Sequence, residues 1–300
     1  MICVFDIESI PDFHLLRDSF GFEGSPLQIA QSAAEEQYAK NGSSFLSLCF
    51  HRVISIGSVI CDDFGRFVKV GHFGTHFLES LPHSLDSIDF LSSDFLDTLE
   101  KTLLNEFWTF FNKNNPRLVS FNGRGFDIPT MLLRAMRYDI NAWAYYEQDN
   151  PTHNKSKWEN YRQRYSEVFH TDLLDSLGNF GVVRSLKLDN ICKMLGLVGK
   201  YDMSGEQVFD TYINAQSAKD KLTALETINH YCHSDVLNTY WLYLKYELLK
   251  GHIIESDYYH ILQEFLANFP ANKPYSQVFK DTLEWHITKY TQDSTKDSDG

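Results

Sequence analysis

The stretch VFDIESIP, residues 4–11, places two carboxylates inside an apolar run at the start of the chain. Its Ile, Val and Phe content predicts a β-strand, in which successive side chains point to opposite faces. Asp6 and Glu8 therefore share one face, while Phe5 and Ile7 share the other. Two like charges this close repel each other and need a counter-charge. The segment is either an edge strand whose polar face meets water or a site for a divalent cation, which prefers oxygen ligands.

The composition limits the class of protein. A chain of 300 residues suits one large α/β domain or a domain with appendages. A net charge of −13 argues against a generic binder of nucleic acids or acidic membranes, although it is compatible with a local basic groove. Five cysteines without a C-x-x-C pair favour reduced thiols in a cytoplasmic protein. No apolar run reaches the roughly 20 residues of a membrane span, and no secretory signal is present, so we expect no membrane partner.

Periodicity and turn residues predict a mixed sheet of five to six strands with helices on both faces. Ser25 and Pro26 open a helix within an insert at about residues 20–45. Residues 52–63 and 66–74 are expected to form an antiparallel meander with the first strand. Further strands are expected at 116–123 and 168–175, and helices at 93–115, 128–138, 185–197 and 218–250. The predicted class is therefore α/β.

The end of the chain is predicted to be helical and then disordered. Residues 255–269 and 276–290 are two amphipathic segments, and we assign residues 251–290 to a C-terminal helical extension. This extension either packs on the main domain or binds a protein partner. The small and charged residues 291–300 predict a disordered tail.

Two later segments supply further acids. Asp127 follows a predicted strand and a Gly-containing turn in LVSFNGRGFDIPT, where an Asp is also a favoured helix N-cap. Tyr231 and Asp235, in INHYCHSDVLNTYW, are four residues apart and share one face of a helix. Taken alone, this pair is equally a partly buried tyrosine beside a solvated carboxylate. The histidines around Cys232 have no matching ligands elsewhere in the chain, so we do not expect a transition-metal site.

Taken together, FDIESIP, NGRGFD and YCHSD resemble the three exonuclease motifs of the DEDD superfamily, in its tyrosine-bearing (DEDDy) branch. FHRVISIGSV, HTDLLD and LKLDNICKMLGLVGKYDMSGEQVF are similar to a stand-alone bacterial family of 3′–5′ exonucleases. That family is related to the exonuclease domain of family-B DNA polymerases. The resemblance covers most of residues 1–250 and weakens in the insert and after residue 250. It implies a DnaQ-like, RNase H-like exonuclease domain over residues 1–250.

The resemblance also implies a two-metal mechanism with Mg²⁺ or Mn²⁺. Asp6 would bridge both ions and Glu8 would complete the shell of one. Asp235 would hold the ion on the nucleophile side, and Asp127 would hold the other. Tyr231 would orient the attacking water, because a phenol with a pKa near 10 is a poor base at neutral pH. The expected reaction releases nucleoside 5′-monophosphates from the 3′ end of single-stranded DNA or RNA.

Substrate contacts are expected from Ile7, Asn122, Arg124 and Phe126, which lie in the first and second motifs. Asp172 is interpreted as a structural acid. Basic and aromatic residues are interleaved around the second motif, and they form either a single-strand-binding surface or a solvated loop with core aromatics. These are Arg124, Arg134, Arg137, Lys155, Lys157, Arg162 and Arg164, with Trp143, Trp158, Tyr161 and Tyr165. Lys187 and Lys200 either meet phosphates or are plain surface lysines.

Two other functions remain open on the sequence. One is a non-catalytic module that binds nucleic acid or protein on a nuclease fold, although all four acids and the tyrosine are present. The other is a metal-dependent phosphohydrolase that acts on nucleotides or very short oligonucleotides, which the weak overall basicity slightly favours.

Overall fold

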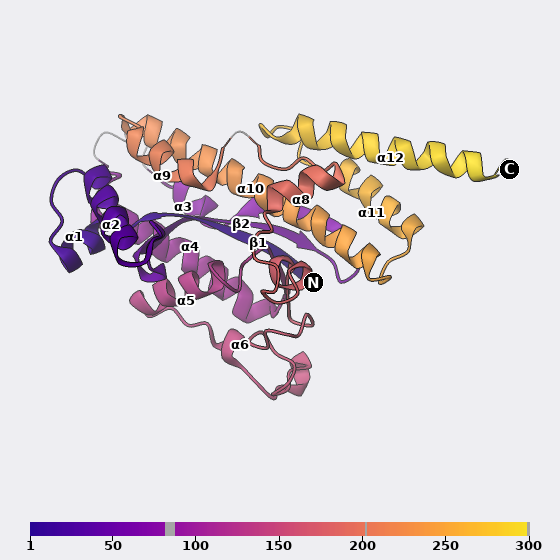
Figure 1. Ribbon diagram of the computed structural model, residues 1–300, viewed down its shortest axis with the longest axis horizontal. Helices are drawn as coiled ribbons and strands as arrows, with labels where there is room; N and C mark the ends of the chain where they lie inside the picture. The colour runs from indigo at the N-terminus through magenta and orange to yellow at the C-terminus, as the bar shows by residue number, and fades with distance from the viewer. Residues whose placement is uncertain (82–87, 202, 299–300) are drawn as a thin grey trace.

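A single mixed sheet organises the computed structural model, which describes residues 1–81, 88–201 and 203–298 (Figure 1). The strand order is β3-β2-β1-β4-β5. The strands are β1 (Ile2–Pro11), β2 (His51–Cys61), β3 (Phe67–His72), β4 (Arg117–Ser120) and β5 (His170–Asp172). The first three form an antiparallel meander, while β4 and β5 run parallel to β1. The predicted mixed α/β sheet is confirmed, with five strands in the described part of the chain.

The strand that carries the first two acids lies at the centre of this sheet. The alternative of an edge strand facing water is therefore wrong. β1 pairs with β2 from Ile2 to Pro11, with a register shift between Glu8 and Ser9. It pairs with β4 only at Ile2–Val4. Beyond Val4 the β4 side of the strand is available to other groups, and this opening receives the second motif.

Helices cover both faces of the sheet, as predicted (Figure 1). α4 (Ser93–Asn114) and α5 (Asp127–Arg137) lie on one face, where Phe5 packs against Phe107. α10 (Ala218–Leu249) crosses the other face, and Ile2 and Val4 belong to the apolar cluster beneath it. Because side chains alternate along a strand, Asp6 and Glu8 continue the row of Ile2 and Val4 and face α10.

The insert after β1 contains two helices. α1 (Phe13–Phe20) was not predicted, and Asp12 caps it by accepting a hydrogen bond from the Leu15 N–H. α2 (Pro26–Asn41) begins as predicted, with a capping box formed by Ser25 and Gln28. The sequence also missed α9 (Gly205–Asn214), which has its own capping box. Shorter elements are η1 (Leu48–Phe50), α3 (Thr75–Glu79), α6 (Trp143–Tyr146), η3 (Pro151–His153), α7 (Leu173–Leu177) and α8 (Leu188–Leu195).

The C-terminal helices pack on the main domain. α11 (Glu255–Ala267) and α12 (Ser276–Ser298) bury Tyr258, Phe265 and Phe279 in the cluster that also contains α10. Of the two expectations for the extension, packing on the domain is therefore the one observed. α12 continues to Ser298, through most of the segment that we predicted to be disordered. Residues 299–300 of the predicted tail lie outside the described residues.

A buried charge network fixes the insert and α5 to the sheet. Arg52 on β2 pairs with Asp12 at 2.9 Å, and Arg134 on α5 pairs with the same carboxylate at 2.9 Å. Arg134 Nε also donates to Glu100 on α4 at 2.8 Å, and Glu100 accepts the Val53 N–H at 2.7 Å. The network places the start of the insert, β2, α4 and α5 in one rigid unit behind the acids.

Candidate active site

Four carboxylates meet on the α10 side of the sheet. Asp6 and Glu8 come from β1, Asp127 from the start of α5 and Asp235 from α10. Glu8 is 7% exposed and Asp127 is 3% exposed, while the other two are partly buried. Burial raises the pKa of Asp6 well above its usual value, and the charges of the other three acids raise it further. The structure thus brings all four predicted metal-binding acids into one electrostatic cluster.

The opening beside β1 explains how Asp127 reaches this cluster. Asp127 is the first residue of α5 and not its N-cap, a position that Phe126 occupies without a side-chain cap. The Ile7 N–H, which β4 does not engage, donates to Asp127 Oδ1 at 3.0 Å. One carboxylate oxygen is therefore fixed by the central strand.

A glycine allows α10 to lie close over the acids of β1. Gly57 on β2 is paired with Asp6, and a Cβ at Gly57 would lie 2.7 Å from Cys232 Sγ. Ser55, paired with Glu8, donates its hydroxyl to Asn229 Oδ1 on α10 at 2.6 Å. This close contact sets Asp235, one turn after Tyr231, over the strand.

None of the four acids is held by a close positive partner, although the charge of Lys200 partly opposes the rise that burial causes in the pKa of Asp235. None of them forms an ion pair in residues 1–81, 88–201 and 203–293, whose side chains the structure describes. Burial raises the pKa of Asp127 to about 7 and that of Asp235 to about 6. It also raises the pKa of Glu8 well above normal, with help from the charges of Asp235 and Asp127. A buried group of like charges without a counter-ion fits a site for divalent cations.

The donor set favours a hard cation. Asp6, Glu8 and Cys232 offer ligand atoms that lie within 4.8 Å of one another. However, burial raises the pKa of Cys232 well above its usual value, and its thiol donates to the Asp6 carbonyl at 3.5 Å. The oxygens that remain suit Mg²⁺ or Mn²⁺. The sequence pattern did not predict that Cys232 touches the acids, because only the contact between α10 and β1 makes it a neighbour.

His233, the residue after Cys232, makes its contacts away from the acids. His233 Nε2 lies 3.1 Å from His72 Nδ1, and His233 Nδ1 lies 3.1 Å from the Tyr275 hydroxyl. Their partners are on β3 and the segment before α12, away from the thiol that contacts Asp6.

Tyr231 lies beside Asp235 and is 6% exposed. Burial raises its pKa well above the usual value, and the negative charges of Asp235 and Glu8 raise it further. The phenol therefore keeps its proton and makes a hydrogen bond to the Asp235 carboxylate. Such a group can donate and orient, but it cannot accept a proton at neutral pH.

The turn of the second motif is shaped by Asp172. Its two carboxylate oxygens accept the backbone N–H groups of Asn122 and Arg124, each at 2.8 Å. The Arg124 guanidinium donates to the carbonyls of Tyr161, Ser166 and His170. Asp172 thus has the structural geometry expected of it. The Arg124 side chain, a candidate substrate contact, is engaged inside the fold.

The interleaved basic and aromatic residues divide into two groups. Arg134, Lys155 and Tyr161 are buried at 2%, 3% and 0% exposure, so the alternative of a single-strand-binding surface does not hold for these three residues. Lys155 donates to the Ala144 carbonyl at 2.7 Å and therefore supports its own loop. Trp143, Trp158 and Tyr165 remain exposed, with Lys157 and Arg162 over aromatic rings.

Two cavities flank the acid cluster and share two lining residues, Gly205 and Glu206. The first, which we call the apolar lobe, has a volume of about 510 Å³ and lies beside Glu8. Ile7 and Phe126, both predicted substrate contacts, line it. The second, which we call the lysine lobe, has a volume of about 750 Å³ and lies beside Asp235. Asn122 and Arg124 line neither lobe.

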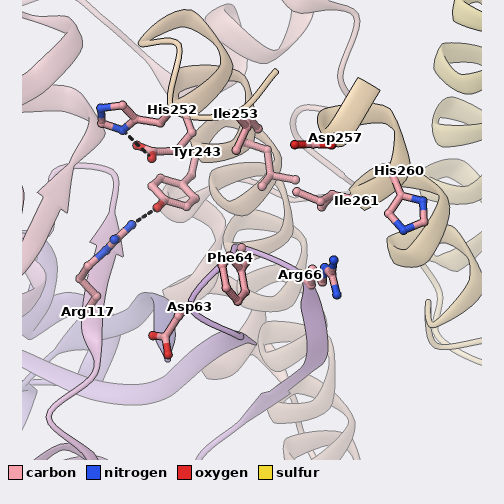
Figure 2. A pocket seen from close by; sticks show the side chains of 13 residues that line it. Asp63, Phe64, Arg66, Arg117, Tyr243, His252, Ile253, Asp257, His260 and Ile261 are labelled. Atoms are coloured by element: carbon pink, nitrogen blue, oxygen red, sulfur yellow. Dashed lines mark hydrogen bonds and ion pairs between the residues drawn. The ribbon is translucent and has the colours of Figure 1, made fainter. Parts of the chain in front are cut away.

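A third cavity, of about 320 Å³, lies apart from the acids (Figure 2). It is lined by the turn between β2 and β3, the end of α10 and the start of α11. Arg117 donates to the Tyr243 hydroxyl there, and His252 pairs with Glu247 at 3.0 Å. None of the predicted site residues lines this cavity.

Within the described ranges, every helix is too short or too polar to cross a bilayer.

The fold and the site define an α/β protein with four clustered acids over the central strand of a mixed sheet. Residues 43–283 match the family described as a predicted 3′–5′ exonuclease related to the exonuclease domain of PolB. The chain therefore belongs to this family of predicted 3′–5′ exonucleases, and the resemblance seen in the motifs is confirmed. The matched region begins after Asp6 and Glu8. It includes most of the C-terminal extension, where we expected the resemblance to weaken.

A solved structure similar to the chain is the family B DNA polymerase from the hyperthermophilic archaeon Pyrobaculum calidifontis. The two chains are 16% identical with a TM-score of 0.43, and the match covers 94% of this chain and 26% of that chain. This protein thus spans about a quarter of the length of the polymerase. No curated protein matches the chain significantly.

Proposed function

We propose that the protein removes nucleoside 5′-monophosphates from the 3′ end of single-stranded DNA or RNA, using two divalent ions, Mg²⁺ or Mn²⁺. The observation that carries this proposal is the group of four acids without an ion pair in the described residues. Membership of a family of predicted 3′–5′ exonucleases supports the direction of the reaction. In two-metal sites, bound ions stabilise the attacking and leaving oxygens of an in-line displacement.

The acids differ in how they could hold such ions. Asp6 feels the charges of all three other acids, which suits a ligand shared by two ions. Glu8 feels both Asp235 and Asp127, and it would complete the shell of one ion. Asp127 has one oxygen fixed by the Ile7 N–H, which leaves the other for a cation or a water.

Tyr231 would position the nucleophile. Its phenol stays protonated and lies beside Asp235, so it can donate a hydrogen bond to a water held at that carboxylate. It does not act as the base, because its raised pKa leaves no phenolate at neutral pH. This assigns Asp235 and Tyr231 to the side of the attacking water.

A non-catalytic binding module is a weaker explanation of the same cluster. Buried like charges without partners cost stability, and binding alone does not require them.

Ile7 and Phe126 in the apolar lobe support contact with the terminal nucleotide.

The test is digestion of 5′-labelled single-stranded DNA and RNA of equal sequence in Mn²⁺, Mg²⁺ or EDTA. We expect a ladder that shortens from the 3′ end only with metal. Asp6→Ala should lower the rate at least about 100-fold, and Tyr231→Phe should lower it by about 10²-fold. The faster substrate identifies the preferred nucleic acid.

Asp18→Ala is the matched control, because Asp18 is an exposed acid on α1 and should leave the rate unchanged. A metal-independent ladder, or full activity in Asp6→Ala, would contradict the proposed mechanism. Activity on dinucleotides alone would instead point to a short-oligonucleotide phosphohydrolase.

A further inference from the structure

The apolar lobe is unsuited to a chain of phosphates. Its lining includes no Lys or Arg, and its charged residues, Glu8, Glu206 and Asp210, are all acidic. Phe45, His51 and Phe126 form an aromatic group in its wall, with ring centroids 4.9 Å apart for Phe45–His51 and 5.1 Å apart for His51–Phe126. α2 of the insert closes the opposite wall with Leu27, Ala30, Gln31 and Ala34. Such a lobe fits a base and a sugar but repels further phosphates.

The lysine lobe differs in that its lining holds cations as well as acids: Lys187 and Lys200, with Asp189, Glu206 and Asp235. Lys187 and Lys200 line it, and neither ammonium group has an ion pair or hydrogen bond within the described ranges. Asp189 also lines the lobe, but its carboxylate pairs with Lys193 at 2.7 Å and accepts the Lys200 backbone N–H at 2.9 Å. Its charge is therefore partly compensated. Burial raises the pKa of Asp235 and the charge of Lys200 partly opposes this rise, but neither lysine forms a close ion pair in the described residues.

This asymmetry matches the chemistry of a strand end. A 3′-terminal nucleotide has a single phosphate, which is the scissile one, whereas each nucleotide upstream adds another phosphate. The lobe without cations can therefore hold only the terminal nucleoside. The lobe with two lysines, and with the larger volume of about 750 Å³, can hold the charged upstream part.

We propose that Lys187 and Lys200 bind the phosphates on the 5′ side of the scissile bond, so that the strand runs from the lysine lobe across the acids into the apolar lobe. This inference rests on the proposed exonuclease function and adds the polarity of the bound strand. Gly205 and Glu206 line both lobes, which places the two lobes next to each other.

The test compares two substrates in Mn²⁺. One is an oligothymidylate of about ten nucleotides, and the other is the p-nitrophenyl ester of thymidine 5′-monophosphate. In the ester, nitrophenol replaces the upstream strand, so no phosphate lies beyond the scissile one. Lys187→Gln/Lys200→Gln should lower kcat/KM on the oligonucleotide about tenfold at low salt and leave the ester rate unchanged. The slope of log kcat/KM against log salt should become shallower by about 1.4, because each single-strand phosphate contact contributes about 0.7.

Two further variants make the result specific. Lys101→Gln/Lys113→Gln removes two exposed charges from α4, which lines neither lobe, and should change neither rate. Lys187→Arg/Lys200→Arg should retain the oligonucleotide rate, because the charge is kept. Equal losses on both substrates, or an unchanged oligonucleotide rate with an unchanged salt slope, would overturn the proposed polarity. A wild-type protein that hydrolyses neither substrate would overturn the exonuclease function itself.

Discussion

Replacing Asp127 by Asn should stabilise the metal-free protein and reduce its response to metal. Burial raises the pKa of Asp127 from 3.8 to about 7, which opposes folding by about 4 kcal/mol once the carboxyl is ionised in both states. The Asn side chain keeps an oxygen for the Ile7 N–H, which donates at 3.0 Å, and it gains an amide that can donate to Asp6. The substitution therefore removes the charge of the Asp127 carboxylate and keeps its hydrogen-bonding positions.

The expected shift follows from the size of the protein. Unfolding entropy of about 2.1 cal/mol/K per residue gives about 0.6 kcal/mol/K for 300 residues. A gain of about 4 kcal/mol then raises Tm by about 6 °C in EDTA above pH 7. The folded state holds the Asp127 proton more tightly than the unfolded chain, so this carboxyl lowers stability as pH rises from about 4 to 7. The gain from Asn should therefore fade as pH falls and vanish below about pH 4.

Metal should stabilise the wild type more than the Asp127→Asn variant. A divalent ion at a hundredfold excess over its Kd stabilises the folded wild type by about 2.7 kcal/mol, or about 4 °C. Asp127→Asn should show a smaller rise with Mn²⁺, because the site has lost one anionic ligand. The assay is thermal unfolding followed by circular dichroism at several pH values, in EDTA and in Mn²⁺. Asp18→Asn, an exposed acid on α1, is the matched control. A lower Tm for Asp127→Asn in EDTA at about pH 8, or an equal Mn²⁺ shift in both proteins, would refute the reasoning.

Two more predictions concern the packing that holds the acids in place. Gly57→Ala should destabilise the protein by about 1–3 kcal/mol in urea unfolding, because the new Cβ would meet Cys232 Sγ at 2.7 Å. Adding Cys232→Ala should restore part of that loss, and a fully additive double variant would argue against the contact. Gly71→Ala is the control, because nothing lies within 4 Å of a Cβ at that position. Arg134→Met should cost about 3–5 kcal/mol because it leaves the buried Glu100 carboxylate without an ion pair and removes one of the two arginines on Asp12. Arg137→Met, on the exposed side of the same helix, should cost less than about 1 kcal/mol, and similar losses in the two variants would contradict a structural role for the buried network.

Short-range patterns in the sequence determined the elements that carry the site. Alternation along a strand placed Asp6 and Glu8 on one face, and helical spacing placed Tyr231 and Asp235 on another. The start of α2 at Ser25 and Pro26 was equally visible, because a helix cap depends on residues close together in the chain. These features rest on local geometry that neighbouring residues decide. The mixed sheet followed from the order of such elements along the chain.

Only the tertiary structure decided which side chains meet. It placed β1 at the centre of the sheet, engaged the Arg124 and Arg134 guanidinium groups inside the fold and set Cys232 against Asp6. Residue type does not reveal these partners, since an arginine that binds carbonyls has the same sequence signature as one that binds phosphate. The division between a lobe without Lys or Arg and a lobe with two lysines depends in the same way on contacts between distant segments. Long-range pairing is fixed when the sheet and helices pack, and no local pattern encodes it.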